Sequence, residues 1–445
     1  MQNAKTVRRV NVGLIGLGTV GGGTLQLLAQ NSRLIADRAS EIVVKRVCNL
    51  DIPYTEAKIA ELGLTETTAT SDYHDLVNDP EIDIVIELIG GIHPALEMVK
   101  AALSAGKSVV TANKDLVASH GAELFQLAAE NKADFLFEAS VAGGIPILKA
   151  LKDSLAANNI VEIMGIVNGT TNYILSQMSH TGADFQPCLQ RAQELGYAEA
   201  NPTNDIEGFD AARKMAILAS IAYNANITED MVYVEGITKI SKFDIDYAAQ
   251  LGYVIKLVGL ARPGADSETT AENSVEVCVY PLMIPLAHPL AAVNDVFNAV
   301  FVEGDALGQS MFYGRGAGSL PTASAVAGDV IAAARHILNG TKGGYGLRLF
   351  AQRQVLPIGE CYNKFYIRLM VQDKPKVLAQ IAEAFAASDI SLDSVIQKRV
   401  MDSGLAEIVL ITHQVKEANL QEAVERLHRL SCVDCVASLI RVKGE

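Results

Sequence analysis

The stretch VNVGLIGLGTVGGGTLQLLAQ, residues 10–30, decides how the fold begins. Its first six residues are mostly apolar, which is typical of a strand covered on both faces. GLGTVG then follows in GxGxxG spacing and leads into a helix-length segment. Glycine is needed at such a turn because the backbone bends tightly, approaches a pyrophosphate and lets the helix pack on the strand. We therefore predict a dinucleotide site made by Gly16, Gly18, Thr19, Val20 and Gly21.

The strand pattern recurs up to about residue 140. Short apolar runs alternate with helix-length segments, and the runs are those at 41–49, 83–90, 107–113 and 133–139. This alternation favours an α/β fold with a Rossmann-type, doubly wound parallel sheet. The run SVVTANKDLV places Lys114 after one of these strands, at the sheet edge where ligands of such folds bind. We expect residues 1–140 to form this domain and a helix at 321–340 to complete it.

Beyond residue 140 the order of strands and helices becomes irregular. Residues 141–320 read as an α+β domain with a mixed sheet, and the glycine-punctuated segment 341–360 reads as a linker. From 361 to 445 the patterns run strand, helix, strand, strand, helix, strand, which predicts a compact βαββαβ domain. A chain of 445 residues is long enough for two or three such domains.

Composition narrows the class of function. Apolar residues make up 49% and charged residues 20%, as in ordinary folded proteins. The net charge of -14 disfavours nucleic acid or anionic membrane as the main partner. Neither a secretory signal nor an apolar run long enough to span a bilayer is recognisable, so we expect a cytoplasmic protein. Cys432 and Cys435 form a lone CxxC, which we interpret as two reduced thiols rather than a redox or zinc pair.

The sequence leaves the choice of nicotinamide cofactor open. Asp51, near the end of the expected second strand, could accept a hydrogen bond from a ribose hydroxyl and favour NAD. Lys45, Arg46 and Lys58 are nearby cations that could hold the 2′-phosphate of NADP instead. A second glycine-rich segment, YGRGAGSLPTASAV, leads into a helix and contains Gly316. Glycine at this position is explained either by a ligand at the helix N-terminus or by a tight crossover between domains.

Ionisable residues gather in GYAEANPTNDIEGFDAARK, residues 196–214, directly before the uncharged stretch MAILASIAY. Asp210 and Lys214 are four residues apart and share one helical face. An exposed pair of this kind contributes only a few tenths of a kcal/mol. Because the helix continues as apolar on all sides, we expect its first turns to face an enclosed cleft, where charges are costly unless they serve a function.

These stretches together resemble the homoserine dehydrogenase family in its bacterial form with a C-terminal ACT domain. The family signature matches without a gap at Ala192, Gly196, Tyr197, Asn201, Pro202, Asp205, Ile206, Gly208, Asp210 and Lys214. IGGIHPA, VVTANKDLVA, EASVAGGIPI, VNGTTNYIL and GRGAGSLPTASAV are similar to the family's other blocks, in its order. The segment from 361 is similar to ACT domains, although Lys376 stands where their effector loop commonly has glycine.

The resemblance implies a reaction and a set of roles. The enzyme would interconvert L-homoserine and L-aspartate 4-semialdehyde with NADP or NAD, on the route to threonine, methionine and isoleucine. Glu199, Asp205 and Asp210 would bind the substrate, Lys214 would transfer the proton, and Lys114 would assist it next to the cofactor.

Further partners are implied in the same way. A sodium or potassium ion would be held by the loop of Glu138, Val141, Gly143 and Ile145. An amino acid such as threonine would act on the ACT domain, and the chain would form a homodimer or homotetramer.

Two other classes of protein remain as alternatives. A non-catalytic sensor that binds a dinucleotide and an amino acid would keep the glycine turn, but it would not need both lysines together with Glu199 and Asp210. A semialdehyde enzyme that forms a thioester would need a cysteine nucleophile with a histidine base. No cysteine in this sequence stands at a strand-to-helix turn of the kind expected for a cleft.

Overall fold

The chain folds into two compact units in this computed structural model, which describes residues 9–264, 273–344, 353–400 and 405–444. Unit 1 comprises the described parts of Met1–Asn159, Ala216–Glu229 and Phe312–Gln352. Unit 2 comprises those of Ile160–Met215, Asp230–Met311 and Arg353–Glu445. The domain boundaries expected after residues 140, 320 and 360 stay predictions.

Unit 1 is built on a parallel sheet. Its strands are β1 (Arg9–Ile15), β2 (Glu41–Cys48), β3 (Thr68–Thr70), β4 (Ile84–Glu87), β5 (Ser108–Thr111) and β6 (Phe135–Leu136). They lie in the order β3-β2-β1-β4-β5-β6, and each neighbouring pair is parallel. The doubly wound sheet expected from the alternating pattern is thereby confirmed. The short, polar strand β3 was not predicted, because three residues carry too little periodicity to mark a strand.

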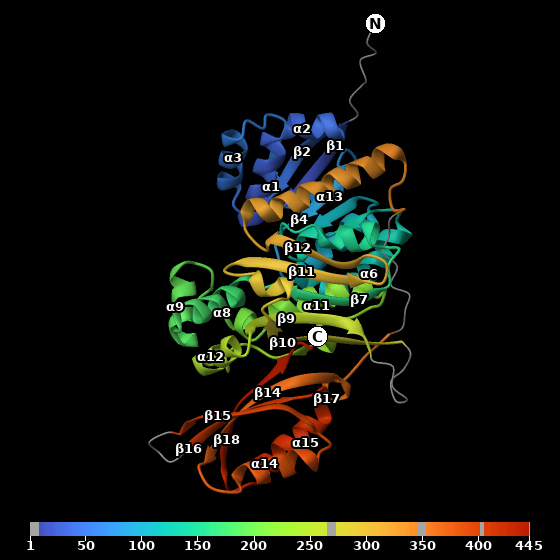
Figure 1. The fold of residues 1–445 in the computed structure, drawn as a ribbon. Coiled ribbons are helices and arrows are strands. Elements are labelled where there is room, and N and C mark those ends of the chain that lie inside the picture. Colours follow the sequence, from blue (N-terminus) through green and yellow to red (C-terminus); the bar gives the residue numbers. More distant parts are fainter. Residues whose placement is uncertain (1–8, 265–272, 345–352, 401–404, 445) are drawn as a thin grey trace. The chain divides into compact units, whose positions relative to one another are not determined.

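Helices cover this sheet, and one of them comes from far along the chain. They are α1 (Thr19–Gln30), α2 (Ser32–Arg38), α3 (Ile52–Glu61), α4 (His74–Val77), α5 (Ala95–Ser104), α6 (Lys114–Glu130) and α13 (Ser319–Asn339). Helix α13 lies beside α1 (Figure 1) and buries Val326, Val330 and Ala334 in one core with Val12 and Ile86 of the sheet. A short connection with η1 (Glu138–Ser140), α7 (Ile147–Lys149) and the π-helical turn η2 (Ala150–Ser154) follows β6.

Unit 2 contains a mixed sheet. Its first strands are β7 (Ile160–Ile166), β8 (Tyr233–Val234), β9 (Tyr253–Pro263), β10 (Ser274–Pro285), β11 (Phe297–Gly304) and β12 (Gly308–Arg315), in the order β12-β11-β7-β9-β10. The last residues of β12, from Phe312 on, belong to unit 1. β7, β9, β10 and β11 pair antiparallel, whereas β8 joins β10 in parallel. Met164, Val258, Tyr280 and Phe301 lie in the core on this sheet. The mixed character expected for this region is confirmed.

The helices of unit 2 carry the charged signature segment. They are α8 (Gly169–Thr181), α9 (Phe185–Glu194), α10 (Thr203–Ile206), α11 (Phe209–Ala222) and α12 (Lys242–Gln250). Helix α11 begins in unit 2 and enters unit 1 after Met215. The segment 196–214 therefore spans the turn after α9, the short helix α10 and the first turns of α11.

The C-terminal part of unit 2 has the expected βαββαβ order, with a two-residue strand added before its second helix. It consists of β14 (Tyr362–Gln372), α14 (Val377–Ala386), β15 (Leu392–Val400), β16 (Leu405–Thr412), β17 (Val415–Lys416), α15 (Glu417–His428) and β18 (Val433–Val442). Strand β18 also pairs in parallel with β10, so the C-terminal sheet continues the mixed sheet. Lys376, which replaces the common glycine, has φ +75° at the start of α14. Glycine adopts that left-handed conformation without strain, which explains its frequency at this position.

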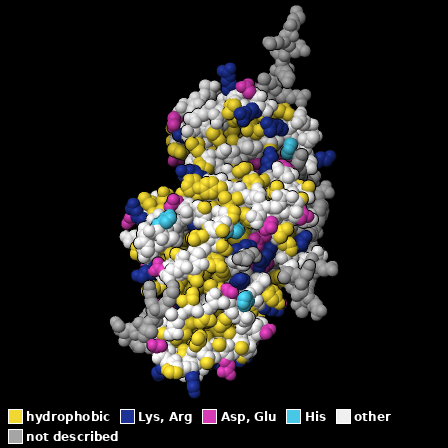
Figure 2. Space-filling view, in the orientation of Figure 1, with side chains coloured by type: hydrophobic (Ala, Val, Ile, Leu, Met, Phe, Trp, Pro, Cys, Tyr) yellow, Lys and Arg dark blue, Asp and Glu magenta, His cyan; other side chains and the backbone are white. Residues whose placement is uncertain are grey.

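The segment expected as a linker is partly ordered into unit 2. Residues 345–352 of it lie outside the described residues, whereas β13 (Gln354–Val355) pairs with β10 and η5 (Ile358–Glu360) precedes β14. All six cysteines are free thiols, including Cys432 and Cys435. Within the described ranges, no helix combines the length and apolar character needed to cross a membrane. On the face shown in Figure 2, Lys and Arg side chains are interspersed with Asp and Glu.

Candidate functional site

Two carboxylates and a lysine meet at the start of α11. Lys214 Nζ donates to Asp210 Oδ2 at 2.7 Å and to the Val167 carbonyl, which directly follows β7, also at 2.7 Å. The Lys214 and Asp210 side chains are only 13% and 12% exposed, so this pair is not the exposed surface ion pair that was the simplest alternative. The helical spacing of the two residues accounts for their contact, and the strand end fixes the lysine from the other side.

Asn168 joins this pair to a second carboxylate. Its Nδ2 donates to Asp205 Oδ1 at 2.6 Å and to Asp210 Oδ2 at 2.9 Å. Its Oδ1 accepts from the Thr171 N–H at 2.9 Å, which caps α8. An amide has one donor end and one acceptor end, and both are used here. Asn168 therefore holds the two acidic side chains next to each other at the beginning of a helix.

The electrostatics of the cluster follow from its partial burial. Burial raises the pKa of Asp205 above its ordinary value, the Asn168 hydrogen bond opposes that rise, and the charge of Asp210 adds to it. Two neighbouring carboxylates repel each other, and Lys214 compensates one of the two charges. An ammonium has three donors, and the two bonds to Asp210 and Val167 leave a third for an oxygen of a ligand.

Helix α8 is anchored by a buried lysine. Lys256 of β9 is 1% exposed, and its Nζ donates to the Val293 carbonyl at 2.6 Å, to Asn294 Oδ1 at 3.0 Å and to Asn172 Oδ1 at 3.1 Å. Burial lowers the pKa of Lys256 to about 8. Because Asn172 belongs to the first turn of α8, this lysine also fixes the helix start that carries Asn168.

Glu199 differs from the other acidic residues proposed for substrate binding. Its side chain is exposed, and its main-chain carbonyl accepts from Gln193 Nε2 at 3.1 Å. Among the described residues, no hydrogen bond joins the Glu199 carboxylate to Asp205, Asp210 or Lys214. The structure thus brings Asp205, Asp210 and Lys214 into one cluster and leaves Glu199 outside it.

The glycine turn of unit 1 requires glycine where the backbone is tight and leaves open space at the N-terminus of α1. Gly16 has φ +90°, and a Cβ on Gly21 would lie 2.0 Å from the Gly16 carbonyl oxygen. A Cβ on Gly18 would meet nothing within 4 Å, so the backbone there is open to a ligand at the N-terminus of α1. Ser319 Oγ donates to the Thr19 carbonyl at 2.7 Å, which brings the second glycine-rich loop against the first.

The other proposed cofactor residues lie near this turn in the fold or at the same sheet edge. Gly316 precedes α13 by three residues, and its carbonyl would lie 2.4 Å from a Cβ on Gly143. Lys114 begins α6 directly after β5, and Asn113 caps that helix by accepting from the Leu116 N–H at 3.1 Å. Lys114 belongs to unit 1 and Lys214 to unit 2.

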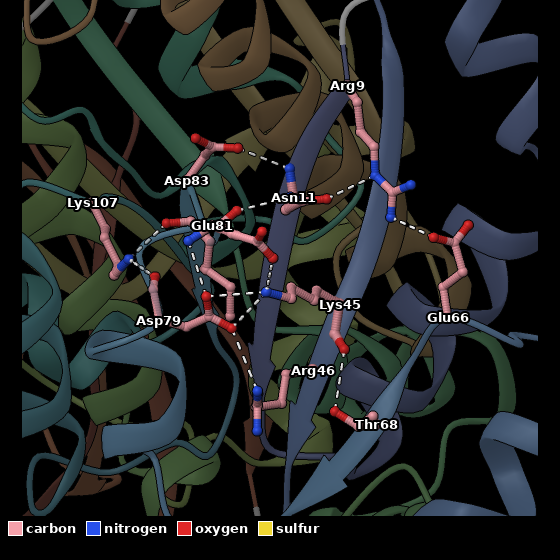
Figure 3. A network of polar contacts seen from close by, with 11 residues as sticks. Arg9, Asn11, Lys45, Arg46, Glu66, Thr68, Asp79, Glu81, Asp83 and Lys107 are labelled. Atoms are coloured by element: carbon pink, nitrogen blue, oxygen red, sulfur yellow. Dashed lines mark hydrogen bonds and ion pairs between the residues drawn. The ribbon is translucent and has the colours of Figure 1, made fainter.

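Lys45 and Arg46, two of the cations suggested for a 2′-phosphate, are paired with acidic side chains (Figure 3). Lys45 contacts Asp79 Oδ2 at 2.8 Å and also pairs with Glu81, and Arg46 Nη2 lies 3.4 Å from Asp79 Oδ2. The hydrogen bond to Asp79 raises the pKa of Lys45, and the same bond lowers the pKa of Asp79.

The two remaining candidates near β2 are also engaged. Lys58 pairs with Glu61 at 2.9 Å, one turn further along α3. The Asp51 carboxylate accepts from the Tyr54 N–H at 3.0 Å and thereby caps α3.

The loop expected to hold a monovalent cation is tightly folded. Ala142 and Gly143 have successive φ values of +53° and +49°. The Glu138 carboxylate accepts from the Leu148 and Lys149 N–H groups at 2.9 and 2.7 Å, so this side chain is turned to α7. Across the ranges that the structure describes, no group of three or more His, Cys, Asp or Glu residues could hold a metal.

Comparison with known protein families matches three segments of the chain. Residues 16–138 match the family model of the homoserine dehydrogenase NAD-binding domain, and residues 146–331 match that of homoserine dehydrogenase itself. Residues 365–432 match the ACT domain family.

Similar proteins cover almost the whole chain. Homoserine dehydrogenase of Mycobacterium tuberculosis is 44% identical over 98% of both chains, and that of Bacillus subtilis is 39% identical over 98% of this chain and 99% of the relative. Among solved structures, a homoserine dehydrogenase from Thiobacillus denitrificans is 43% identical, with a TM-score of 0.91 over 98% of this chain and 99% of its own.

A more distant solved structure was determined with a cofactor. A hyperthermophilic archaeal homoserine dehydrogenase in complex with NADPH is 29% identical over 73% of this chain and 98% of its own, with a TM-score of 0.60. With family matches over most of the chain, full-length relatives above 30% identity and a glycine turn shaped for a dinucleotide, the chain belongs to the homoserine dehydrogenase family, whose members are oxidoreductases that use a nicotinamide dinucleotide.

Proposed function

We propose that this protein interconverts L-homoserine and L-aspartate 4-semialdehyde, with NAD or NADP as the hydride carrier. The observation that carries the proposal is the cluster of Lys214, Asp210, Asp205 and Asn168 at the start of α11. It combines a lysine suited to proton transfer with carboxylates suited to an ammonium group. A substrate that bears both a hydroxyl and an ammonium group needs such a combination.

Each residue near Lys214 then has a separate role in the reaction. A nicotinamide dinucleotide bound at the glycine turn of unit 1 would supply the acceptor for the hydride that leaves C4 in homoserine oxidation. In the oxidative direction Lys214 acts in its neutral form, which keeps two N–H bonds for Asp210 and the Val167 carbonyl and takes the proton of the substrate hydroxyl on its lone pair. In the reverse direction the ammonium returns that proton to the aldehyde oxygen. Asp210 and the Val167 carbonyl hold Nζ in place during both steps. Lys114, at the carboxyl end of β5, assists from the cofactor side.

The acidic residues receive the polar groups of the substrate. Asp205 and Asp210 lie together in the half-buried cluster, where a substrate ammonium would relieve the repulsion between them. The exposed Glu199 carboxylate reaches the substrate when the turn that follows α9 moves toward Asp205 and Asp210. We therefore assign Asp205 and Asp210 as the principal substrate residues and Glu199 as a residue that closes on the bound substrate.

The preferred cofactor follows from the region around β2. Lys45, Arg46 and Lys58 are already paired with Asp79, Glu81 and Glu61, which weighs against a 2′-phosphate at these cations. Asp51 has a second carboxylate oxygen available for a ribose hydroxyl while it caps α3. These contacts favour NAD over NADP.

The remaining partners are proposed on family resemblance. A sodium or potassium ion would be held by main-chain carbonyls of Glu138, Val141, Gly143 and Ile145, because the Glu138 carboxylate is used by α7. The reaction would serve threonine, methionine and isoleucine synthesis, with an amino acid such as threonine acting on the ACT domain. The functional assembly would be a homodimer or homotetramer.

One assay tests the central proposal. Purified protein is mixed with L-homoserine and either NAD or NADP, and the absorbance of the reduced nicotinamide is followed, with and without added threonine and with sodium or potassium salts. We expect turnover with both cofactors and a higher kcat/KM with NAD. Binding of a dinucleotide without turnover would contradict the proposal and favour the non-catalytic sensor.

A further inference from the structure

Residues 233–237 lie between the ACT domain and the substrate cluster within unit 2. Tyr233 and Val234 form β8 in register with Cys278 and Val279 of β10, and the Glu235 N–H donates to the Val279 carbonyl at 2.8 Å. Strand β10 therefore pairs both with this segment and with β18 of the ACT domain.

The other end of the segment is packed against α10, the helix that carries Asp205. The Ile237 N–H donates to the Ile206 carbonyl at 2.8 Å. A Cβ on Gly236 would lie 2.3 Å from the Ile206 oxygen and 2.5 Å from the Glu207 Cα, so only glycine fits there. A displacement of residues 235–237 therefore displaces the end of α10, because the two backbones are in direct contact.

An arginine of the ACT domain holds this segment. Arg441 of β18 is 6% exposed, and its Nη1 donates to Glu235 Oε2 at 2.7 Å. Its Nε and Nη2 donate to the two carboxylate oxygens of Glu417 in α15, at 2.5 and 2.9 Å. The guanidinium also lies over the Tyr280 ring, 4.4 Å from its centroid, and over the Tyr233 ring at 5.2 Å. Such a bidentate, stacked arginine has very little freedom to move.

We propose that Arg441 and Glu235 are positioning residues for the dehydrogenase reaction. Their ion pair holds residues 233–237 against α10 and so keeps Asp205 at hydrogen-bonding distance from Asn168. This inference rests on the proposed function, since it assigns Asp205 to substrate binding. It also makes the last strand of the ACT domain part of the structure that supports the substrate site.

The consequence is a change in substrate affinity rather than in chemistry. Residues 233–237 also approach the start of α11, since a Cβ on Gly208 would lie 3.0 Å from Val234 Cγ1. Lys214, however, is held directly by Asp210 and by the Val167 carbonyl at the end of β7. Loosening the ion pair therefore moves Asp205 and weakens substrate binding, while proton transfer at Lys214 is retained.

The test uses the full-length protein with Glu235→Gln and Glu235→Ala. Arg441 keeps both bonds to Glu417 in these variants, so its charge is not left unpaired in the interior. We expect the KM for L-homoserine to rise about three- to tenfold, with kcat changed less than about twofold and the KM for the cofactor unchanged. Gly236→Ala disturbs the same contact without touching the ion pair, and its KM for L-homoserine should rise as well.

Lys443→Met is the matched control. Lys443 Nζ pairs with Glu162 Oε1 at 2.5 Å and so connects the end of β18 to β7, and Glu162 keeps Arg262 Nη1 at 3.8 Å when the lysine is replaced. Its KM for L-homoserine should equal that of the wild type.

The outcomes separate this inference from the function on which it rests. A wild type without turnover of L-homoserine would refute the proposed function and this inference with it. Normal wild-type turnover, with an unchanged KM in both Glu235 variants at temperatures where circular dichroism shows them folded, would refute this inference alone.

Discussion

Asn168 determines the geometry of the candidate site at the scale of single residues. It is 5% exposed and lies 37 and 42 positions before Asp205 and Asp210 in the sequence, the two carboxylates to which it donates. The same side chain caps α8, so one residue links the start of a helix to both acidic groups. Removing the donor would leave two half-buried carboxylates without their common partner.

Substitution of Asn168 separates its two roles. Asn168→Asp keeps an oxygen that can cap α8, but it cannot donate to Asp205 and Asp210, and it adds a third negative charge. Asn168→Ala loses the cap as well, which costs about 1 kcal/mol of stability. We expect both variants to lose about ten- to hundredfold in kcat/KM for L-homoserine. Steady-state kinetics with urea unfolding measures both effects, and an Asp variant with normal kcat/KM would rule out the donor role.

Lys214→Met tests proton transfer directly. Methionine keeps the apolar stem of the side chain and removes the amine, so kcat should fall by about 10²- to 10⁴-fold while cofactor binding is retained. The measurements are steady-state turnover and fluorescence titration of the cofactor. Lys242→Met, a partly exposed lysine of α12 with its nearest carboxylate at 3.9 Å, is the control and should behave as wild type. An equal loss of turnover and of cofactor affinity in Lys214→Met would contradict the assignment.

Among the elements, the glycine turn before α1 offers a comparison between adjacent residues. A Cβ on Gly21 would lie 2.0 Å from the Gly16 oxygen, whereas a Cβ on Gly22 would meet nothing within 4 Å. Gly21→Ala should therefore distort the turn and weaken cofactor binding at least about tenfold, since α1 can no longer approach the strand. Gly22→Ala should be neutral or stabilise the protein by up to about 1 kcal/mol. Calorimetric titration of the cofactor decides, and equal affinities in the two variants would contradict the proposed role of the turn.

Helix α13 carries a buried acid that gives stability a pH dependence. Burial is the main reason that the pKa of Asp329 rises to about 7. The hydrogen bond from the Glu138 N–H lowers this pKa and the Glu138 charge raises it, while the charges of Lys152 and Lys149 lower it. The folded state therefore holds a proton that the unfolded chain loses near pH 4. The contribution of Asp329 to stability is fully present below about pH 4 and is lost as the pH rises through about 7.

Asp329→Asn should remove that slope. The amide oxygen can still accept from the Glu138 N–H, which is now bonded to Asp329 Oδ2 at 2.8 Å. We expect the variant to be more stable than wild type near pH 8, by roughly 1 to 4 kcal/mol, and similar to it near pH 4. Urea unfolding across this pH range measures the difference, and parallel stability curves for the two proteins would refute the prediction.

At the scale of the whole molecule, buried charges join the ACT domain to the rest of unit 2. Arg368 of β14 donates to Asp244 Oδ1 of α12 at 2.9 Å and to Glu407 Oε1 of β16 at 3.1 Å. The Tyr247 hydroxyl of α12 donates to the same Glu407 at 2.6 Å. Because these groups are buried, removing one leaves the others without compensation.

Arg368→Met should therefore destabilise unit 2 strongly. We expect a loss of about 3–5 kcal/mol in the free energy of unfolding, the usual effect of breaking a buried ion pair from one side. Arg429→Met removes a largely exposed partner of Glu425 and should change stability by less than about 0.5 kcal/mol. Urea unfolding compares the two variants, and similar midpoints would show that the buried network contributes little.

Sequence patterns predicted much of the fold because they record local properties. Alternating apolar runs indicated the parallel sheet, and the βαββαβ order of the last domain was recognisable from its periodicity. The i, i+4 spacing of Asp210 and Lys214 predicted their contact. The signal for Asn168 was present too, since an asparagine before GTT is typical of a helix cap, but its carboxylate partners lie far away in the sequence.

Taken alone, the sequence determined most of the longer strands and helices, the position of the glycine turn and which acidic and basic residues gather before α11, because each depends on near neighbours in the chain. Only the tertiary structure decided that Lys45 and Arg46 pair with Asp79, that Asn168 joins Asp205 to Asp210, and that Arg441 reaches Glu235 across 206 positions. Those contacts depend on strand order and register, which bring distant segments together and which no local periodicity records.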